Sequence, residues 1–320
     1  MIDRRDFLKT AALAALATPL VVRPRPASAR SIPRVGVLGE VNPIGWNARM
    51  AAAEIECRWA GDRRERLRDL AAELVALDVD LLVAIGAAAA RAAGTATKTV
   101  PIVFVAGRDQ VDEDLARRRD NVTGLIVPSE AEIAEERLRV LRLVAPGLER
   151  VIALSNPDNP TGPRALEHGH AAADRQGADM SVVPARTTAE IEQALAAAPL
   201  GTGLLVMPDA MFAIEARRIA TLASERRLPG VYPARCFVEA GGTVALHGDA
   251  AEVVRRTVAL VARVLGGGAP GALPVRTCAP LALAVNLDAA RAMGLALPRS
   301  LLARADRVAG AQGAPPRSPG

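Results

Sequence analysis

The feature that most constrains the fold of this chain is a regular alternation of short, apolar, β-branched runs with longer amphipathic segments rich in Ala and Arg. In the run at 80–85, Asp-Leu-Leu-Val-Ala-Ile, the apolar residues are consecutive rather than alternate. A strand buried on both faces has this pattern, and parallel sheets covered by helices bury both faces of their strands. The alternation therefore predicts a doubly wound α/β architecture.

The same patterning locates the individual elements. The expected strands are 34–38, 55–59, 81–85, 102–105, 122–127, 151–154, 180–183, 204–207, 230–232 and 243–246. The expected helices are 63–77, 87–93, 131–144, 163–176, 189–197, 211–226 and 250–265.

The strand–helix pattern starts over after residue 127, which predicts two doubly wound parallel-sheet lobes joined by a multi-strand hinge. A chain that crosses between lobes several times lets several segments share the rotation of a hinge. The expected first lobe comprises 30–127 and 247–272, and the expected second lobe comprises 128–246 and 273–308. The Gly- and Pro-rich tail, 309–320, is expected to be disordered.

The first 29 residues have the composition of a cleaved signal peptide. A charged start with Arg4 and Arg5 precedes an apolar run of 13 residues from Thr10 to Val22, and Ala27-Ser28-Ala29 forms a small-x-small cleavage site. A membrane-spanning helix needs about 20 apolar residues, so no lasting membrane insertion is expected. The paired arginines suggest the twin-arginine route, with the general secretory route as the alternative. No cysteine lies near the cleavage site, so we expect a periplasmic protein without a lipid anchor.

Removal of this segment changes the charge balance. The whole chain has 40 Lys and Arg against 35 Asp and Glu, and residues 1–29 account for five of the basic and two of the acidic residues. A net charge of +2 remains, which argues against a nucleic-acid partner. The three cysteines are too few and too scattered for a disulfide framework or a zinc site, and buried thiols are the expectation.

Candidate binding residues follow from the architecture, because ligands bind beyond the carboxyl ends of the strands in open parallel sheets. Both sets of strand ends are expected to face one interlobe cleft. The candidate ligand contacts are Glu40, Asn42, Gly86, Ala87, Ala88, Arg108 and Asp109 in the first half and Asn156, Asn159, Asp209, Met211, Tyr232, Arg235 and His247 in the second.

Several of these residues have a structural alternative. Gly86 opens a helix whose free N–H groups could bind a carboxylate, although it could equally be an ordinary tight turn. Arg235 could pair with a ligand carboxylate, and Asp109 or Asp209 could receive an ammonium group. Asp209 is also well placed as the N-cap of the helix that begins at Met211, and capping is compatible with ligand contact.

The sequence offers no pattern for a metal, a cofactor or catalysis. His168 and His170 are two apart on a predicted helix and so lie on opposite faces, where they cannot chelate one ion together. No nucleophile elbow, phosphate-binding loop or dinucleotide fingerprint occurs in a suitable context. A non-enzymatic protein without a cofactor is therefore expected, and an exported α/β enzyme is the less favoured alternative.

Several segments together resemble the periplasmic substrate-binding proteins of ABC transporters described as the tryptophan/tyrosine type. The resemblance covers nearly the whole chain, and its segments are the Arg-Arg-Asp-Phe-Leu start, 99–105, 121–124, 156–160, 232–242, 292–295 and 298–306. It implies a type I periplasmic-binding-protein fold, a small-molecule ligand in the cleft, and a permease with its ATPase as partners. A monomer is expected. The lactose-repressor relatives of this fold would need a DNA-reading helix-turn-helix before the first strand, where this chain has a signal instead.

Two departures from the family pattern leave a second function open. The first two strands are separated by less sequence than in most members, and Ala87-Ala88 stands where relatives commonly have a hydroxyl residue followed by proline. A non-transport sensor or scaffold is therefore the alternative to an importer receptor. Aromatic residues make up only 2% of the chain, so we expect a polar, amino-acid-like or organic-acid solute rather than an aromatic one.

Overall fold

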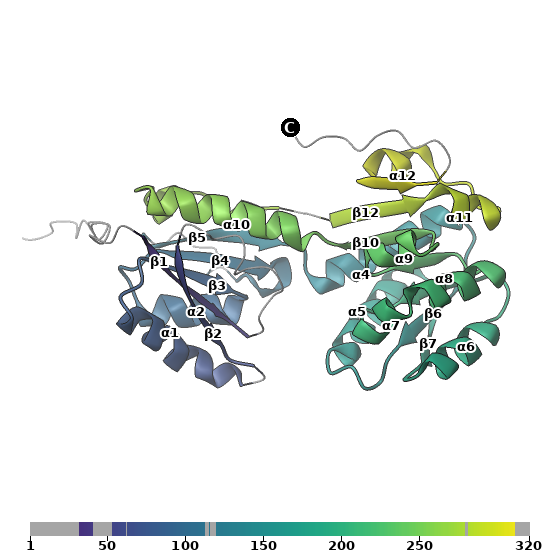
Figure 1. Cartoon of the computed structure of the whole chain (residues 1–320), viewed down its shortest axis with the longest axis horizontal. Helices are drawn as coiled ribbons and strands as arrows, with labels where there is room; N and C mark the ends of the chain where they lie inside the picture. The colour runs from purple at the N-terminus through teal and green to yellow at the C-terminus, as the bar shows by residue number, and fades with distance from the viewer. Residues whose placement is uncertain are drawn as a thin grey trace, which may run out of the picture.

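The computed structural model describes residues 32–40, 53–61, 63–112, 115, 120–278 and 281–310, which form two α/β lobes side by side (Figure 1). The expected signal peptide and Asn42 lie outside the described residues. So does the expected disordered tail from residue 311 onward, whereas Ala309 ends a strand of the second lobe. The two-lobed doubly wound α/β fold is confirmed.

The first lobe is built on a six-stranded parallel sheet of the order β11-β5-β4-β3-β1-β2 in the described part of the chain. Its strands are β1 (Arg34–Gly39), β2 (Glu54–Trp59), β3 (Leu81–Ile85), β4 (Ile102–Gly107), β5 (Val122–Val127) and β11 (Arg276–Thr277). Its helices are α1 (Leu67–Ala76), α2 (Ala87–Ala96) and α10 (Ala250–Leu265), with short 3-10 turns η1 (Arg64–Arg66), η2 (Arg108–Gln110) and η3 (Pro270–Ala272).

The second lobe has a seven-stranded sheet of the order β13-β12-β10-β9-β8-β6-β7 within the described ranges. Its strands are β6 (Arg150–Ser155), β7 (Asp179–Pro184), β8 (Thr202–Val206), β9 (Gly230–Tyr232), β10 (Val244–Gly248), β12 (Leu281–Asn286) and β13 (Arg307–Ala309). Its helices are α4 (Glu130–Val144), α5 (Gly162–Gln176), α6 (Thr188–Ala196), α7 (Ala210–Ile214), α8 (Ala216–Glu225), α9 (Arg235–Glu239), α11 (Leu287–Ala292) and α12 (Arg299–Arg304).

Alternation along each strand explains how one sheet serves two helical layers. In β3, Leu82 and Ala84 belong to the core under α1 and α2, whereas Leu81 and Val83 belong to the core under α10. Successive side chains of a strand point to opposite faces, so a strand covered on both sides must be apolar throughout. The consecutive apolar residues in the sequence are therefore explained by burial on both faces of the sheet.

The chain crosses between the lobes after β5, after β10 and after β11. In β10 the chain runs out of the second sheet toward the first lobe, and it returns at the same end of the sheet to form β12. β12 must therefore run opposite to β10, and the two strands pair antiparallel with Val244 opposite Val285. The other described strand pairs in both sheets are parallel.

Two crossings lie later in the chain than the sequence indicated. His247 pairs with Ala282 inside the second sheet, so the second crossing follows Gly248 rather than preceding residue 247. Arg276 and Thr277 pair with β5 of the first sheet, so the third crossing follows residue 277 rather than 272. Both residues of β11 are exposed, and a strand without buried side chains leaves no hydrophobic pattern to detect.

Of the three cysteines, Cys278 is buried as expected, whereas Cys57 and Cys236 are only partly buried. Burial raises the pKa of the Cys57 and Cys278 thiols, which keeps both protonated near neutral pH. In the described ranges, no helix combines the length and the apolar character that crossing a bilayer requires.

Candidate functional site

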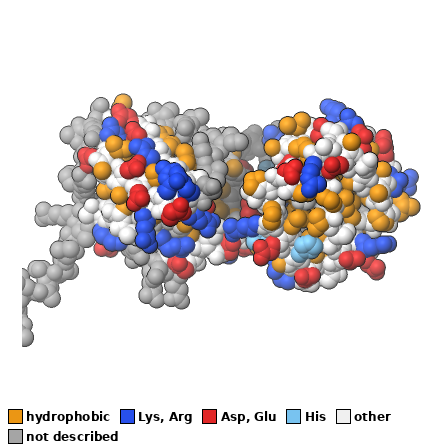
Figure 2. Space-filling view, turned by 90° about the horizontal axis from the view of Figure 1, so that it is seen from below, with side chains coloured by type: hydrophobic (Ala, Val, Ile, Leu, Met, Phe, Trp, Pro, Cys, Tyr) orange, Lys and Arg blue, Asp and Glu red, His pale blue; other side chains and the backbone are white. Residues whose placement is uncertain are grey.

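A pocket of about 510 Å³ lies beyond the carboxyl ends of β1, β3 and β4, and Arg164 of the second lobe closes its far side. We call it the interlobe pocket. Its described lining residues are Glu40, Arg64, Ala87, Ala88, Arg91, Asp109, Gln110, Val111, Asp112 and Arg164. Figure 2 looks into the gap between the lobes and shows acidic and basic side chains on both sides of it. A volume of this size falls in the range of small-molecule sites.

The start of α2 supplies backbone donors to the interlobe pocket. Gly86 has φ of 92° and ψ of 151°, a conformation that is essentially restricted to glycine, and it turns the chain from β3 directly into the helix. The first N–H groups of a helix have no partner within the helix, and no side chain caps those of α2. Ala87 and Ala88 line the pocket at this point, so these donors are available to an anion.

Among the described residues, two ion pairs and two further charged side chains line the interlobe pocket. Arg64 binds Glu40 at 3.0 Å, and Arg91 binds Asp112 at 2.9 Å. Asp109 and Arg164 make no ion pair with any described residue. In the described part of the chain, the pocket thus has one carboxylate and one guanidinium without an ion pair, which match a ligand that carries both an ammonium and a carboxylate group.

Asp209 is occupied by the protein itself. Its Oδ1 accepts hydrogen bonds from the N–H groups of Met211 at 2.8 Å and Phe212 at 3.3 Å, which caps α7. Its Oδ2 accepts from the side-chain amides of Asn156 at 3.1 Å and Asn159 at 2.9 Å. A carboxylate has about four acceptor positions, so none is left for a ligand ammonium group in this conformation.

The loop that contains Asn156 and Asn159 folds back on itself and thereby fixes the start of α5. Asn156 Oδ1 accepts from the N–H of Asp158 at 3.0 Å, and Asn159 Oδ1 accepts from the N–H of Thr161 at 2.9 Å. Arg164 lies in the first turn of α5 and reaches the interlobe pocket from there. The asparagines and Asp209 therefore position a pocket residue instead of lining the pocket.

Replacing Asp209 by alanine is expected to destabilise the protein by about 2–3 kcal/mol, because a helix cap is worth about 1 kcal/mol and two partly buried amides lose their acceptor. Asp209→Asn keeps one acceptor oxygen and should cost roughly half as much. Urea denaturation followed by circular dichroism measures both values. Equal stability of Asp209→Ala and the unmodified protein would show that the four hydrogen bonds contribute nothing.

Four further candidates are not among the described residues that line the interlobe pocket. Tyr232 is only 1% exposed and stacks on Phe237 inside the second lobe, with ring centroids 5.1 Å apart. Arg235 is exposed and pairs with Glu239 at 3.0 Å. His247 Nδ1 lies 3.0 Å from the carbonyl oxygen of Gly248 at the end of β10.

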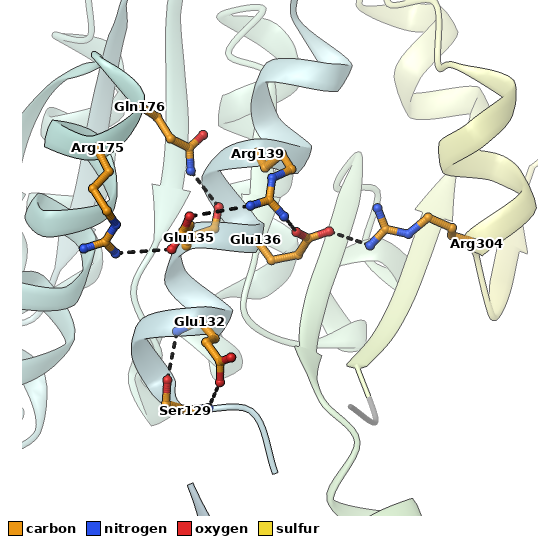
Figure 3. Close-up of polar contacts among 8 residues, drawn as sticks. All are labelled: Ser129, Glu132, Glu135, Glu136, Arg139, Arg175, Gln176 and Arg304. Atoms are coloured by element: carbon orange, nitrogen blue, oxygen red, sulfur yellow. Dashed lines mark hydrogen bonds and ion pairs between the residues drawn. The ribbon is translucent and has the colours of Figure 1, made fainter. Parts of the chain in front are cut away.

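The fourth, Arg108, joins the two lobes. Its Nε lies 2.9 Å from Oε1 of Glu132, a residue in the first turn of α4. Glu132 also accepts from the N–H of Ser129 while the Ser129 hydroxyl accepts from the N–H of Glu132, which forms a capping box (Figure 3). The pair therefore ties η2 of the first lobe to the start of α4, where the chain enters the second lobe.

Polar contacts hold α4 firmly within the second lobe. Figure 3 shows Glu135 between Arg139 and Arg175, and Glu136 between Arg139 and Arg304. These contacts connect α4 to α5 and to α12, so the rigid part of the lobe begins directly at the crossing.

The sequence analysis did not identify several residues that line the interlobe pocket, among them Arg64, Arg91 and Arg164. A usable signal existed for two of them. Arg91 lies one turn after Ala87 on the same face of α2, and residues four apart on a helix are neighbours. Arg164 follows Pro163 in the first turn of the helix that comes after β6 and its loop. In the described part of the chain, no group of His, Cys, Asp and Glu side chains could hold a metal ion.

Two parallel-sheet lobes joined by three crossings, with a polar pocket between the strand ends, define a binding protein of the type I periplasmic-binding-protein fold. The family model described as ABC transporter substrate binding protein matches residues 49–309. The chain belongs to this family of ABC transporter substrate-binding proteins, whose members bind small molecules and work with a permease.

Known proteins similar to the chain support this assignment. A tyrosine-binding protein of Clostridioides difficile (strain R20291) is 21% identical over 230 residues, which cover 71% of this chain and 67% of that protein. The ligand-free, open structure of a substrate binding protein with adhesive properties from Clostridium difficile superposes with a TM-score of 0.60, at 18% identity and covering 87% of this chain and 99% of that one. An ABC domain in complex with L-Trp from Streptococcus pneumonia gives a TM-score of 0.54, at 20% identity and covering 86% and 99%. At these identities the two structures show the shared fold alone.

Proposed function

We propose that this protein captures a small solute of the amino-acid or organic-acid class in the interlobe pocket, and that it acts in the periplasm as the monomeric receptor of an ABC importer. The observation that carries the proposal is that Asp109 of the first lobe and Arg164 of the second lobe line the same pocket. Neither side chain has a protein counter-ion among the described residues. A zwitterionic ligand would satisfy both charges and draw the two lobes together.

The position of the N-terminus of α2 favours a ligand whose anionic group is a carboxylate. The uncapped N–H groups at Ala87 and Ala88 point at the same pocket as Arg164, and helix N-termini favour negative charge. Glu40 and Asp112 are already paired with arginines, so they add little repulsion toward an incoming anion.

The composition of the pocket favours a polar ligand. None of its described lining residues is aromatic, and Tyr232 is buried elsewhere. Stacking on a ring is a main contact available to an aromatic side chain, and the described pocket offers none. The names of similar proteins refer to tyrosine and L-Trp. We propose that this chain instead prefers solutes with small or polar side chains.

A thermal-shift screen of the purified protein against amino acids and small carboxylic acids tests the proposal. A ligand present at 100 times its dissociation constant stabilises the protein by about 2.7 kcal/mol, which for lobes of this size raises the melting temperature by several degrees. We expect at least one compound with an ammonium and a carboxylate group to do so, and calorimetry should then give one site per chain. If no compound in a broad panel stabilises the protein, a sensor or scaffold that has lost ligand binding becomes the better explanation.

A further inference from the structure

A second hollow, outside the interlobe pocket, lies on the first lobe between α10 and the edge of the sheet. It has a volume of about 590 Å³, and its described lining residues include Arg255, Arg256 and Arg263 of α10 together with Arg276 of β11. We call it the arginine pocket. Figure 1 shows α10 along the upper face of the first lobe, opposite the face covered by α1 and α2.

The arginines of this pocket come from two separate segments, α10 and β11, whose backbones are held in place by the first lobe. β11 pairs with β5 so that Arg276 lies opposite Leu125, and Leu125 itself lines the arginine pocket. Arg256 and Arg263 are seven residues apart on α10, or about two helical turns, so they lie on the same face of the helix. The fold therefore brings basic residues from two separate segments to one hollow.

The charge of the arginine pocket is only partly neutralised. Glu252 accepts two hydrogen bonds from Arg255 and one from Arg256, each at 2.6 Å, and these hydrogen bonds lower the pKa of its carboxyl to about 2. Arg263 and Arg276 have no acidic partner among the described residues, and no acidic side chain lines the hollow there. Like charges held near one another repel, and a bound anion removes that repulsion.

The walls of the arginine pocket suit a phosphate group. Leu125 and Leu260 line it with apolar surface, and an apolar wall strengthens the field of nearby charges. Guanidinium groups bind phosphate oxygens in a two-pronged geometry, and the Thr277 hydroxyl can add a further donor. The volume exceeds that needed for a single phosphate and accommodates a molecule with several phosphate groups.

We propose that the arginine pocket is a binding site for polyvalent phosphate-bearing anions, separate from the interlobe pocket. The unpaired positive charges of Arg263 and Arg276 supply the affinity. Glu252 holds Arg255 and Arg256 in place and reduces the net charge by one.

Calorimetric titration of the purified protein with inorganic tripolyphosphate tests this site. We expect saturable binding to one site, weakened at least tenfold by Arg263→Gln combined with Arg276→Gln. Arg68→Gln combined with Arg217→Gln is the matched control, because both residues are exposed, lie outside the arginine pocket and carry the same total charge. The control should weaken binding less than twofold.

A substitution that should tighten tripolyphosphate binding distinguishes a specific site from a general electrostatic attraction to a basic protein. Glu252→Gln removes the only described counter-ion of Arg255 and Arg256 and should tighten tripolyphosphate binding severalfold. Asp109→Asn combined with Arg164→Gln, which alters the interlobe pocket, should leave tripolyphosphate binding unchanged. Absence of saturable binding, or equal weakening in the matched control, would overturn the proposal.

Vesicle sedimentation distinguishes a soluble source of the phosphate from a lipid headgroup. Vesicles of equal parts phosphatidylglycerol and phosphatidylcholine are compared with pure phosphatidylcholine. Binding to the anionic vesicles that tripolyphosphate displaces, and that the Arg263/Arg276 variant loses, assigns the site to a lipid headgroup. Tripolyphosphate binding without vesicle binding assigns it to a soluble anion.

Discussion

Replacing Tyr232 by alanine is expected to lower the stability of the second lobe by about 3–5 kcal/mol, the usual cost of removing a large aromatic side chain from a core. The ring is fully buried, stacks on Phe237, and packs against Gly230 and Gly242, where an added Cβ would lie within 3 Å of it. The surrounding backbone cannot collapse easily into the space because it is held in β9 and in the turn before β10. The melting temperature should fall by about 10 °C.

Tyr232→Phe is the matched control, because it keeps the stacked ring and removes only the hydroxyl. We expect it to cost no more than about 1 kcal/mol. Burial raises the pKa of this phenol well above its usual value, so the hydroxyl stays protonated at all ordinary pH values. Below its melting temperature, the Tyr232→Ala variant should bind ligand as the unmodified protein does. Loss of binding at unchanged stability would instead place Tyr232 in the ligand site.

Removing both unpaired charges of the interlobe pocket is expected to weaken ligand binding at least 100-fold. A hydrogen bond to a charged group contributes about 1.5–3 kcal/mol, and 1.4 kcal/mol corresponds to a tenfold change in affinity. Asp109→Asn and Arg164→Gln together leave the net charge unchanged, so long-range attraction is not altered. Calorimetry with the best compound from the thermal-shift screen measures the loss.

Arg235→Gln combined with Glu239→Gln is the control for the variant that carries Asp109→Asn and Arg164→Gln. These residues form an exposed ion pair outside the interlobe pocket, and exposed pairs contribute little to stability. Their replacement also leaves the net charge unchanged and should alter ligand affinity less than twofold. If the Asp109→Asn and Arg164→Gln variant binds the ligand as tightly as this control, the ligand does not bind in the interlobe pocket.

The fold was predictable from the sequence because burial dictates residue type. Val83 and Phe104 lie in strands with both faces covered, so apolar residues are required at consecutive positions. Three of the elements that the sequence analysis did not locate are very short. β11 has two exposed residues, and α9 and β13 are five and three residues long. Segments of that length carry too little periodicity to separate a helix or strand from a loop.

The candidate site was predictable only in part. The general rule about strand ends indicates Glu40, Ala87 and Asp109, and these three residues line one pocket in the structure. The rule does not say where a side chain points. Tyr232 follows the same pattern, yet its side chain turns into the core because Gly230 and Gly242 leave room for the ring there.

The polar loop at 156–161 shows a second reason why the candidate site was predictable only in part. Asn156, Asn159 and Asp209 have the residue types of a ligand site, but their hydrogen bonds are made with one another and with the start of α7. Asn and Asp form such local hydrogen bonds readily, and composition cannot distinguish a loop that is satisfied internally from one that is open to a ligand.

Small-angle X-ray scattering of the purified protein, with and without a saturating mixture of the common L-amino acids and small organic acids, tests most directly whether the chain is a receptor that closes on its ligand. We predict a saturable decrease in the radius of gyration, because Asp109 and Arg164 lie on different lobes and a ligand between them draws the lobes together. The Asp109→Asn and Arg164→Gln variant should show no decrease. An unchanged radius of gyration for the unmodified protein in the full mixture would contradict the proposed function.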